Sequence, residues 1–343
     1  MPTTSHAGAE APAREPTTMR AITQHTYGPA DVLDLEVIAR PTPGRDEVLI
    51  RVEAAGLDRG VWHLMTGLPY VVRLAGYGLR RPKQPVPGLD AAGTVVEVGA
   101  DVTDFAVGDE VYGVATGAYA EFARAKAAKL AHRPDDVTVE QAATIAVSGS
   151  TASQALFDVG GAEPGQRVLI LGASGGVGSW ATMLAHHHGL HVTGVASGAK
   201  ASHVRDLGAD VVLDYATEDF SDEAPFDLII DTGGRNRVAK LRRALTRTGT
   251  LVIVGGEGGG RVTGGAGRQL RAALLSPFVS QRLAMFVAKE QVDAWARVRD
   301  LVAAGELDAP VDQVYPLDRV PDALADLAAG SIAGKAVISL GSE

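Results

Sequence analysis

A glycine-rich turn in the middle of the chain joins an apolar stretch to a helix-forming stretch. Residues 167–171 read Arg-Val-Leu-Ile-Leu, residues 172–178 read Gly-Ala-Ser-Gly-Gly-Val-Gly, and residues 177–188 have helical composition. Glycines at such a turn let the backbone approach a pyrophosphate, and the helix N-terminus offers free N–H groups and a positive dipole end. The pattern predicts a dinucleotide site. Its predicted contacts are Gly172, Ser174, Gly175, Gly176, Val177 and Gly178.

The next apolar stretch ends without an acidic residue. Residues 195–200 read Val-Ala-Ser-Gly-Ala-Lys, and the first acid after them is Asp206. An acid at this place commonly binds the ribose hydroxyls of NAD, whereas a hydroxyl and an ammonium group suit a 2′-phosphate. Ser197 and Lys200 therefore favour NADPH over NADH. The alternative for Lys200 is an ordinary solvated lysine, because lysines are common on surfaces.

Residues 58–70, Asp-Arg-Gly-Val-Trp-His-Leu-Met-Thr-Gly-Leu-Pro-Tyr, carry the candidates for acid–base chemistry. Asp58, His63 and Tyr70 have side chains that can donate a hydrogen bond or a proton. We favour Tyr70 as the donor, because a phenol donates while uncharged at neutral pH. The alternative is that these side chains pack locally or face solvent, since an active-site loop also holds structural residues.

The elements that would position these residues fall into two kinds. The first part has short strand-like stretches between Gly and Pro turns, which is typical of a small barrel or sandwich. From residue 139 onward, helices alternate with strongly apolar strands, which predicts a parallel sheet covered on both faces. The predicted strands are 48–52, 93–98, 110–114, 119–123, 167–171, 191–195, 211–213, 227–231, 250–254 and 336–340, and the later predicted helices are 268–286, 291–303 and 320–328.

Composition excludes several classes of protein. The chain has 343 residues with a formal net charge of -9, and no cysteine, which rules out disulfides and thiolate metal sites. No basic run suggests nucleic-acid binding, and no apolar stretch reaches membrane-spanning length. Residues 1–18 are rich in Pro, Ala, Thr and Glu and are expected to be a disordered tail. We expect a cytoplasmic protein with no nucleic-acid or membrane partner.

Several segments together resemble the medium-chain dehydrogenase/reductase superfamily, close to its zinc-free quinone oxidoreductase branch. They are residues 86–95 with Val98-Gly99, the turn at 105–111, the glycine-rich turn at 172–178 and Gly-Lys-Ala-Val-Ile at 334–338. The resemblance implies an α/β fold in which a Rossmann doubly wound parallel sheet is inserted into a β-rich GroES-like catalytic domain. The implied boundaries are 19–144 and 288–343 for the catalytic domain and 145–287 for the NAD(P)-binding domain.

The same resemblance implies further site residues. Tyr215 would join Ser197 and Lys200 around the 2′-phosphate. The remaining implied contacts, near the phosphates or the nicotinamide, are Ser148, Thr151, Gly255 and Lys335. Zinc-containing members carry Cys at the position of Asp58 and His at the position of Leu89, so a catalytic zinc would lose a thiolate and an imidazole. No metal is therefore expected.

The function that these observations predict is NADPH-dependent, zinc-independent hydride transfer to a quinone or an α,β-unsaturated carbonyl. Enzyme alternatives are an enoyl-thioester reductase and an alcohol dehydrogenase-like enzyme. An alternative of another class is a non-catalytic NADPH-binding sensor. We also expect a homodimer that pairs through residues 250–254, because an apolar edge strand left unpaired is an aggregation risk.

Overall fold

The computed structural model describes residues 17–256 and 260–341 of the chain. A seven-stranded sheet has the order β14-β15-β3-β4-β5-β7, with β6 paired to β3, and β1 and β2 form a separate antiparallel pair. Its long central strand, β3, is buried along most of its length, which places the core of this part around it. The strands are β1 (Thr18–Gln24), β2 (Leu33–Ala39), β3 (Glu47–Leu57), β4 (Asp90–Val98), β5 (Glu110–Val114), β6 (Phe122–Lys126), β7 (Leu130–His132), β14 (Val311–Pro316) and β15 (Lys335–Ser339).

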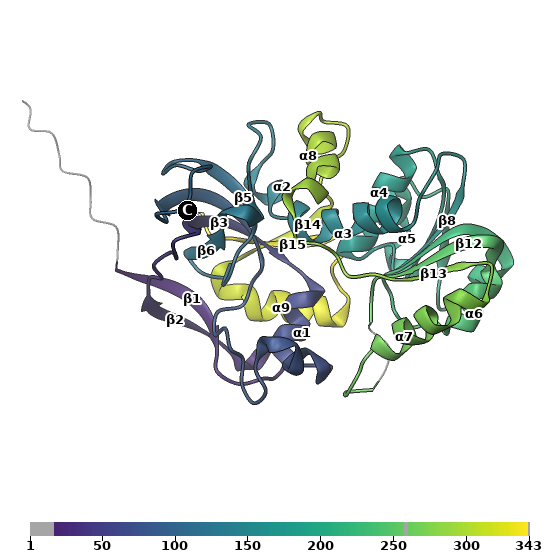
Figure 1. Ribbon diagram of the computed structural model, residues 1–343, viewed down its shortest axis with the longest axis horizontal. Helices are drawn as coiled ribbons and strands as arrows, with labels where there is room; N and C mark the ends of the chain where they lie inside the picture. Colours follow the sequence, from purple (N-terminus) through teal and green to yellow (C-terminus); the bar gives the residue numbers. More distant parts are fainter. Residues whose placement is uncertain (1–16, 257–259, 342–343) are drawn as a thin grey trace, which may run out of the picture.

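A second sheet of six parallel strands lies beside the first (Figure 1). Its order, β10-β9-β8-β11-β12-β13, is that of a doubly wound nucleotide-binding sheet, with the reversal of strand order between β8 and β11. Its strands are β8 (Arg167–Leu171), β9 (His191–Ala196), β10 (Val211–Asp214), β11 (Phe226–Asp231), β12 (Leu245–Ile253) and β13 (Arg282–Met285). The two sheets confirm the predicted fold class, while the exact domain boundaries stay a prediction.

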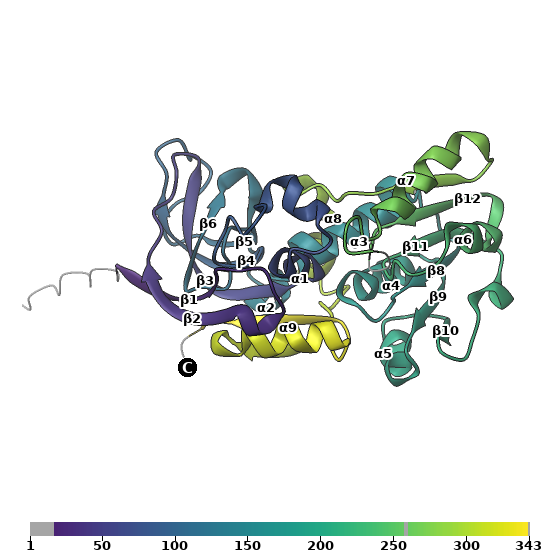
Figure 2. The ribbon, with the colours of Figure 1, turned by 90° about the horizontal axis from the view of Figure 1, so that it is seen from below.

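Helices α4 and α5 cover one face of the parallel sheet, and α6 and α7 cover the other (Figure 2). Such coverage explains why its strands are apolar on both faces. None of the helices in the described part of the chain is long and apolar enough to cross a bilayer. The helices are α1 (Arg59–Thr66), α2 (Val139–Ala142), α3 (Ser150–Ser153), α4 (Gly176–His187), α5 (Ala201–Asp206), α6 (Val238–Ala244), α7 (Ala266–Leu275), α8 (Ala296–Ala303) and α9 (Val320–Ala329).

The segment after α7 differs from the sequence-based prediction of one helix over 268–286. α7 ends at Leu275, and after a short turn through Pro277 the chain forms β13, which pairs in parallel with β12. Proline has no N–H and disfavours a helix interior, which explains the break. The predicted edge, 250–254, is therefore inside the sheet, and β13 is the edge strand.

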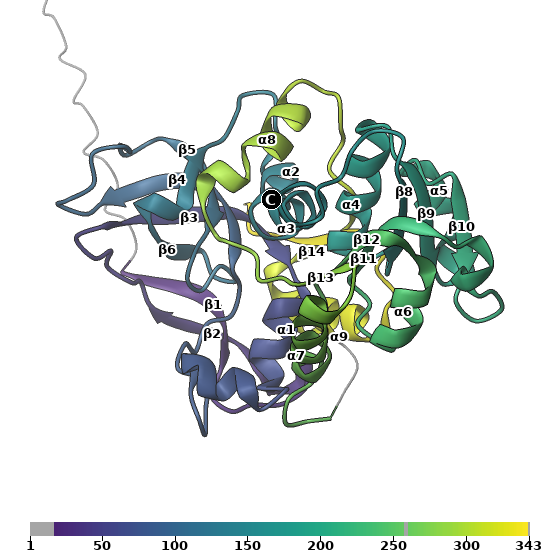
Figure 3. The same ribbon diagram turned by 45° about the vertical axis from the view of Figure 1, so that its right-hand side comes forward.

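Smaller boundaries also differ from prediction. The strand predicted at 119–123 begins at Phe122, and β1 begins at Thr18, inside the predicted tail. The rest of that tail, residues 1–16, lies outside the described residues. Near α2 and α3 the chain passes between the two sheets, and α8 lies over this region (Figure 3). The fully buried Trp295 has its ring 5.8 Å from that of Tyr112, which joins the α8 region to β5.

Candidate active site

The predicted glycine-rich turn lies at the reversal of strand order, between the ends of β8 and α4. Gly172 has φ +79°, and a Cβ at Gly178 would be 2.0 Å from the Gly172 carbonyl oxygen, so only glycine allows this close contact of helix and strand. By contrast, a Cβ at Gly175 would meet only the Gly172 oxygen, at 3.5 Å, and otherwise open space. The N-cap of α4 is Gly175, so no N-cap side chain occupies the N–H groups of the helix's first turn. The turn therefore has room and free amide donors for a pyrophosphate, and it fits a dinucleotide.

The other predicted residues of this turn connect it to the C-terminal strand. Ser174 is buried, and its carbonyl accepts a hydrogen bond from the Gly334 N–H at 2.9 Å. Val177 is half-buried in the first turn of α4. A Cβ at Gly176 would come within 2.8 Å of Cδ of Lys335 and 3.2 Å of Oγ of Ser148. Lys335 and Ser148 thus lie directly beneath the glycine-rich turn.

The predicted 2′-phosphate residues lie at the ends of β9 and β10. Ser197 follows β9 directly, and the N–H of Tyr215 donates to the Ala196 carbonyl at 3.1 Å, so the two strand ends are adjacent. Lys200 donates from Nζ to the Ile332 carbonyl at 2.5 Å and keeps two further donors. Burial lowers the pKa of Lys200, with Asp312 opposing that shift. Ser197, Lys200 and Tyr215 are therefore brought to one end of the sheet.

Two further predicted cofactor contacts are Gly255, which follows β12, and Thr151 in α3. Gly255 approaches the end of β11 so closely that a Cβ would be 1.9 Å from the Thr232 carbonyl oxygen. Thr151 is buried and donates to the Val147 carbonyl at 2.6 Å. Residues 257–259, shortly after Gly255, lie outside the described residues.

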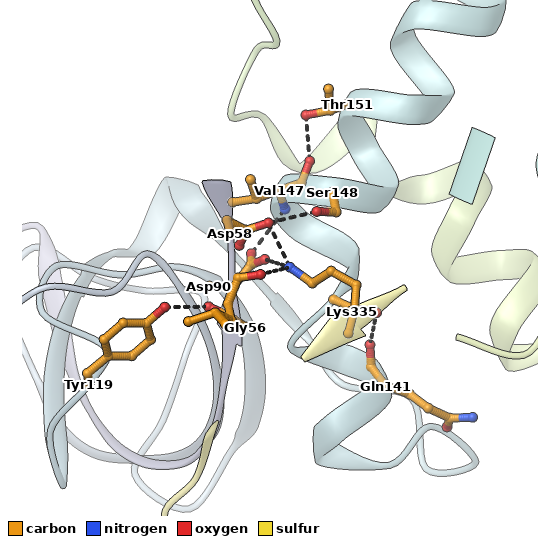
Figure 4. Close-up of polar contacts among 11 residues, drawn as sticks. Gly56, Asp58, Asp90, Tyr119, Gln141, Val147, Ser148, Thr151 and Lys335 are labelled. Atoms are coloured by element: carbon orange, nitrogen blue, oxygen red, sulfur yellow. Dashed lines mark hydrogen bonds and ion pairs between the residues drawn. The ribbon is translucent and has the colours of Figure 1, made fainter. Parts of the chain in front are cut away.

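A buried polar cluster lies where the two parts of the molecule meet (Figure 4). Asp58, the N-cap residue of α1, accepts hydrogen bonds on Oδ1 from Ser148 Oγ at 2.7 Å and from Lys335 Nζ at 2.6 Å. Lys335 Nζ also donates to the Leu57 carbonyl at 3.2 Å and lies 3.7 Å from Asp90 Oδ2. Asp90 Oδ1 accepts from the Val147 N–H at 3.0 Å. Lys335 is 1% exposed and Asp58 5% exposed, so these groups interact away from water.

The two carboxyl groups of this cluster have opposite pKa shifts. Burial, together with the charge of Asp58, holds the pKa of Asp90 well above its usual range. Burial also opposes ionisation of Asp58, but the ammonium of Lys335 and the hydrogen bonds from Lys335 and Ser148 hold its pKa below the usual range. As carboxylates, both groups would have a buried Oδ2 atom with no described donor. The raised pKa of Asp90 favours its protonated form, in which Asp90 would offer a donor to this cluster.

This arrangement corrects one expectation. Asp58 was a candidate donor of a hydrogen bond or a proton, but its carboxylate accepts hydrogen bonds from Ser148 and Lys335, and its pKa is lowered. Lys335 was expected to lie near the cofactor; its aliphatic chain borders the glycine-rich turn, and its ammonium contacts Asp58. Asp90 was missed as a site residue, although it directly follows Leu89, the position at which zinc-containing relatives carry His.

The residues at this position do not fit a catalytic zinc. The cation facing Asp58 is the chain's own ammonium, and Leu89 offers no metal-binding atom in its side chain. Within the described ranges there is also no group of three or more His, Cys, Asp or Glu side chains arranged to hold a metal ion. No step that uses a metal is therefore derived from this site.

The other predicted acid–base residues lie outside the buried cluster. His63 faces the Leu68 carbonyl, with Nδ1 at 2.8 Å. Tyr70 is 38% exposed, and the guanidinium of Arg73 lies 4.8 Å from the centre of its ring. The backbone N–H of Tyr70 donates to the Arg261 carbonyl at 2.8 Å. Tyr70 therefore lies where the loop after α1 meets the chain that leads into α7.

An ion pair at the end of β11 was not predicted. Asp231 is fully buried, accepts from the Gly234 N–H at 2.9 Å and pairs with Arg268 of α7. Nε and Nη1 of Arg268 have no hydrogen-bond partner among the described residues. The sequence did offer a signal for Asp231: it is a charged residue at the end of the apolar strand 227–231. The carboxyl ends of parallel strands form the ligand-binding edge of such a sheet.

Comparison with known proteins identifies the family. A model of the alcohol dehydrogenase GroES-like domain matches residues 44–135, and a model described as a zinc-binding dehydrogenase matches residues 207–338. The chloroplastic quinone-oxidoreductase homolog of Spinacia oleracea is 30% identical over 335 residues, covering 93% of this chain and 98% of the relative. The chain belongs to the quinone oxidoreductase-like branch of the medium-chain dehydrogenase/reductase superfamily. It is an NAD(P)H-dependent oxidoreductase.

Other members of the superfamily show the same fold and related activities. The quinone oxidoreductase of Coxiella burnetii has a TM-score of 0.83 at 26% identity and covers 94% of this chain and 100% of its own. An Escherichia coli quinone oxidoreductase complexed with NADPH has a TM-score of 0.80 at 25% identity, covering 93% and 99%. The 2-methylene-furan-3-one reductase of Solanum lycopersicum is 30% identical over 340 residues, covering 94% and 79%.

Proposed function

We propose that this chain is an NADPH-dependent reductase that works without zinc and transfers hydride to a quinone or an α,β-unsaturated carbonyl. The observation that carries the proposal is the buried pair of Asp58 and Lys335, 2.6 Å apart, beneath the glycine-rich turn. At the position where zinc-containing relatives hold a metal, this chain has an ammonium with a carboxylate.

The choice of NADPH is supported by the end of β9. Ser197 and Tyr215 present hydroxyl groups at neighbouring strand ends, and Lys200 adds an ammonium close by. A carboxylate also lies here: a Cβ at Gly198 would be 2.6 Å from Oδ2 of Asp214, whose Oδ1 accepts from the Ala216 N–H. Only Oδ1 of Asp214 is engaged by its own turn, and the donors offered to a 2′-phosphate are the hydroxyls of Ser197 and Tyr215 and the ammonium of Lys200.

A bound NADPH supplies the hydride from its nicotinamide. The residues of the chain bind the cofactor, orient it and shield it from water. The glycine-rich turn binds the pyrophosphate through backbone N–H groups. Asp58 fixes the Ser148 hydroxyl under the turn by accepting a hydrogen bond from it. The neutral Asp90 and the paired charges of Asp58 and Lys335 keep this floor rigid and free of net charge, and burial excludes water from it.

The class of acceptor is inferred from the lack of an available cation among the buried residues beneath the glycine-rich turn. The Lys335 ammonium is 1% exposed and already contacts two oxygen atoms within 3.2 Å, so it does not reach a substrate carbonyl. A conjugated acceptor suits such a site, because conjugation spreads the charge that hydride addition creates. The enolate then needs a proton, and Tyr70, on the partly exposed loop after α1, is the proposed donor.

A panel of acceptors tests the proposal. NADPH oxidation is followed by absorbance with a quinone, an acyclic enone, an enoyl thioester, an aldehyde and a saturated ketone as control. We expect turnover with the quinone or the enone and none with the saturated ketone. Turnover restricted to the aldehyde would contradict the proposed acceptor class and favour an alcohol dehydrogenase-like activity.

A further inference from the structure

The ion pair of Asp231 and Arg268 lies at the carboxyl end of β11, on the edge where a doubly wound sheet binds its ligand. Asp231 is fully buried, and the side chain of Arg268 is 16% exposed. Separating such a pair is costly, because each charge would be left buried without a counterion. The pair therefore holds the first turn of α7, which contains Arg268, against the end of β11.

The backbone around this ion pair brings two further parts of the chain together. The Asp231 carbonyl accepts hydrogen bonds from the N–H groups of Val254 and Gly255, both at 3.0 Å, where the chain leaves β12. The Gly265 N–H donates to the Gly256 carbonyl at 3.0 Å, and a Cβ at Gly265 would be 2.3 Å from Cα of Gly256. The chain that leaves β12 and the chain that enters α7 are therefore in close contact next to Asp231.

Residues 260–268, which we call the bridge, extend from this ion pair to the loop after α1. The Arg261 carbonyl accepts a hydrogen bond from the Tyr70 N–H at 2.8 Å. The Val262 carbonyl accepts one from the Val71 N–H at 3.0 Å. Two consecutive N–H groups of the loop are therefore bound by two consecutive carbonyls of the bridge.

Packing at Gly264 fixes the same junction. Gly264 has φ +54°, and a Cβ there would be 2.7 Å from Cγ of Pro69. An alanine would therefore be strained and would push the bridge away from the loop after α1. Gly267, in α7, provides a contrast, because a Cβ there would meet only open space.

We propose that Arg268 is a positioning residue for the reaction: with Asp231 it anchors the bridge, and the bridge fixes Tyr70 relative to the carboxyl edge of the parallel sheet. This proposal rests on the function proposed above, in which Tyr70 donates the proton. Hydride addition and protonation occur on one substrate molecule, so the cofactor and the proton donor must keep a fixed relative position. The cofactor is expected at the parallel sheet, whereas Tyr70 belongs to the β-rich part, so the bridge contributes directly to that position.

Replacements of Arg268 test the anchor. Nη2 of Arg268 contacts Asp231, while Nε and Nη1 have no partner among the described residues, so the contact is not bidentate. A lysine ammonium can replace a single contact of this kind, and Arg268→Lys should keep at least roughly a third of the wild-type kcat. Arg268→Met should lower kcat on the order of tenfold or more, because a displacement of about 1 Å can slow a reaction ~10²-fold.

The loss of kcat should depend on Tyr70. In a chain that already carries Tyr70→Phe, the donor is absent, and adding Arg268→Met should lower kcat by less than about twofold. Calorimetry should show NADPH binding within about threefold of wild type in each variant, because the pyrophosphate is expected at the glycine-rich turn. The effect is therefore expected in kcat and not in cofactor affinity.

Hydrogen exchange reports on the bridge without any substrate. In Arg268→Met, the amides of Tyr70 and Val71 should exchange on the order of tenfold faster, because their acceptor carbonyls are no longer anchored. Gly264→Ala acts at the other end of the bridge and should likewise speed this exchange and lower kcat. Gly267→Ala is the matched control and should leave both unchanged.

Two further variants separate positioning from general stability. Arg40 is a second buried arginine, in the β-rich part, with its side chain 7% exposed and 2.8 Å from Glu97. Arg40→Met should lower the free energy of unfolding but leave kcat and the exchange of the Tyr70 amide unchanged. If Arg268→Met does not fold, the double variant Arg268→Met/Asp231→Asn takes its place in each measurement, because it leaves no unpaired buried charge.

An equal loss of kcat for Arg268→Met with and without Tyr70→Phe would overturn the proposal, because the two side chains would then act independently. Unchanged amide exchange at Tyr70 and Val71 would also overturn it. A loss of NADPH affinity as large as the loss of kcat would do the same and would assign Arg268 to the cofactor site. Absence of turnover with every acceptor would contradict the proposed function itself, and amide exchange would still decide whether Arg268 anchors the bridge.

Discussion

Replacing Lys335 with methionine removes the only cation of the buried cluster within the described residues. Methionine keeps a similar length, but the ammonium that contacts Asp58 at 2.6 Å and the Leu57 carbonyl at 3.2 Å is lost. Asp58 stays 5% exposed, with the Ser148 hydroxyl as its remaining described donor. Breaking a buried ion pair by removing one partner costs roughly 3–5 kcal/mol, and we expect the free energy of unfolding to fall by about that amount.

The double variant Lys335→Met/Asp58→Asn isolates the ion pair. It has no charge at Asp58, and the asparagine carbonyl still accepts from Ser148, so we expect it to be more stable than Lys335→Met by about 2 kcal/mol or more. The single variant should also recover stability as pH falls. Burial without the Lys335 ammonium raises the pKa of Asp58, so protonation at low pH removes the uncompensated buried charge.

Urea unfolding of the wild type, both single variants and the double variant provides the measurement. A single variant Lys335→Met within about 1 kcal/mol of wild type would refute the reasoning, because exposed ion pairs contribute no more than that. A double variant as unstable as the sum of the single variants would show that the two side chains do not interact.

Asp90→Asn should flatten the pH dependence of the free energy of unfolding. The pKa of Asp90 is raised in the folded protein, so its contribution to wild-type stability is fully present below about pH 4, the pKa of an unfolded Asp. That contribution is lost as pH rises through the folded-state pKa. Urea unfolding across pH checks this, and equal slopes in both proteins would count against a protonated Asp90. Lys200→Ala should weaken NADPH binding about tenfold, the loss of one charge-assisted contact, and leave NADH binding unchanged. Calorimetry measures both, and parallel losses would remove Lys200 from the 2′-phosphate site. Tyr70→Phe should lower turnover by on the order of a hundredfold, the scale for losing a general acid, with NADPH binding intact. Unchanged steady-state turnover would assign protonation to solvent. The chain should be a homodimer through the β13 edge, where Met285 is 55% exposed, and Met285→Asp should weaken it. Light scattering that finds a monomer of wild type at micromolar concentration would contradict this.

The place of the glycine-rich turn in the fold, between β8 and α4, was predictable because its signals are local. The strand, the glycines of residues 172–178 and the helix follow one another within one short stretch. Each of them restricts the local backbone conformation directly. Ser197 follows the end of β9 in the sequence, so its place at the edge of the sheet follows from the strand alone. The strand order itself needed the resemblance to the family, because many orders are compatible with alternating strands and helices.

The buried cluster was not predictable from local sequence. Asp58 and Lys335 are 277 positions apart, and nothing near either residue reveals the other. Asp58 was therefore assigned a donor role by its residue type, whereas the ammonium beside it makes it an ionised acceptor. β13 was missed for a different reason: residues 268–286 are rich in Ala and Leu, and the helix-ending signal of Pro277 was given too little weight.

Turnover measured together with metal content tests the central claim most directly. The purified protein is treated exhaustively with a chelator, its zinc content is determined by elemental analysis, and NADPH oxidation is followed with the best quinone or enone acceptor. The buried ammonium of Lys335 predicts that full activity persists with zinc far below one equivalent per chain. Activity that disappears with the metal and returns with added zinc would contradict the account.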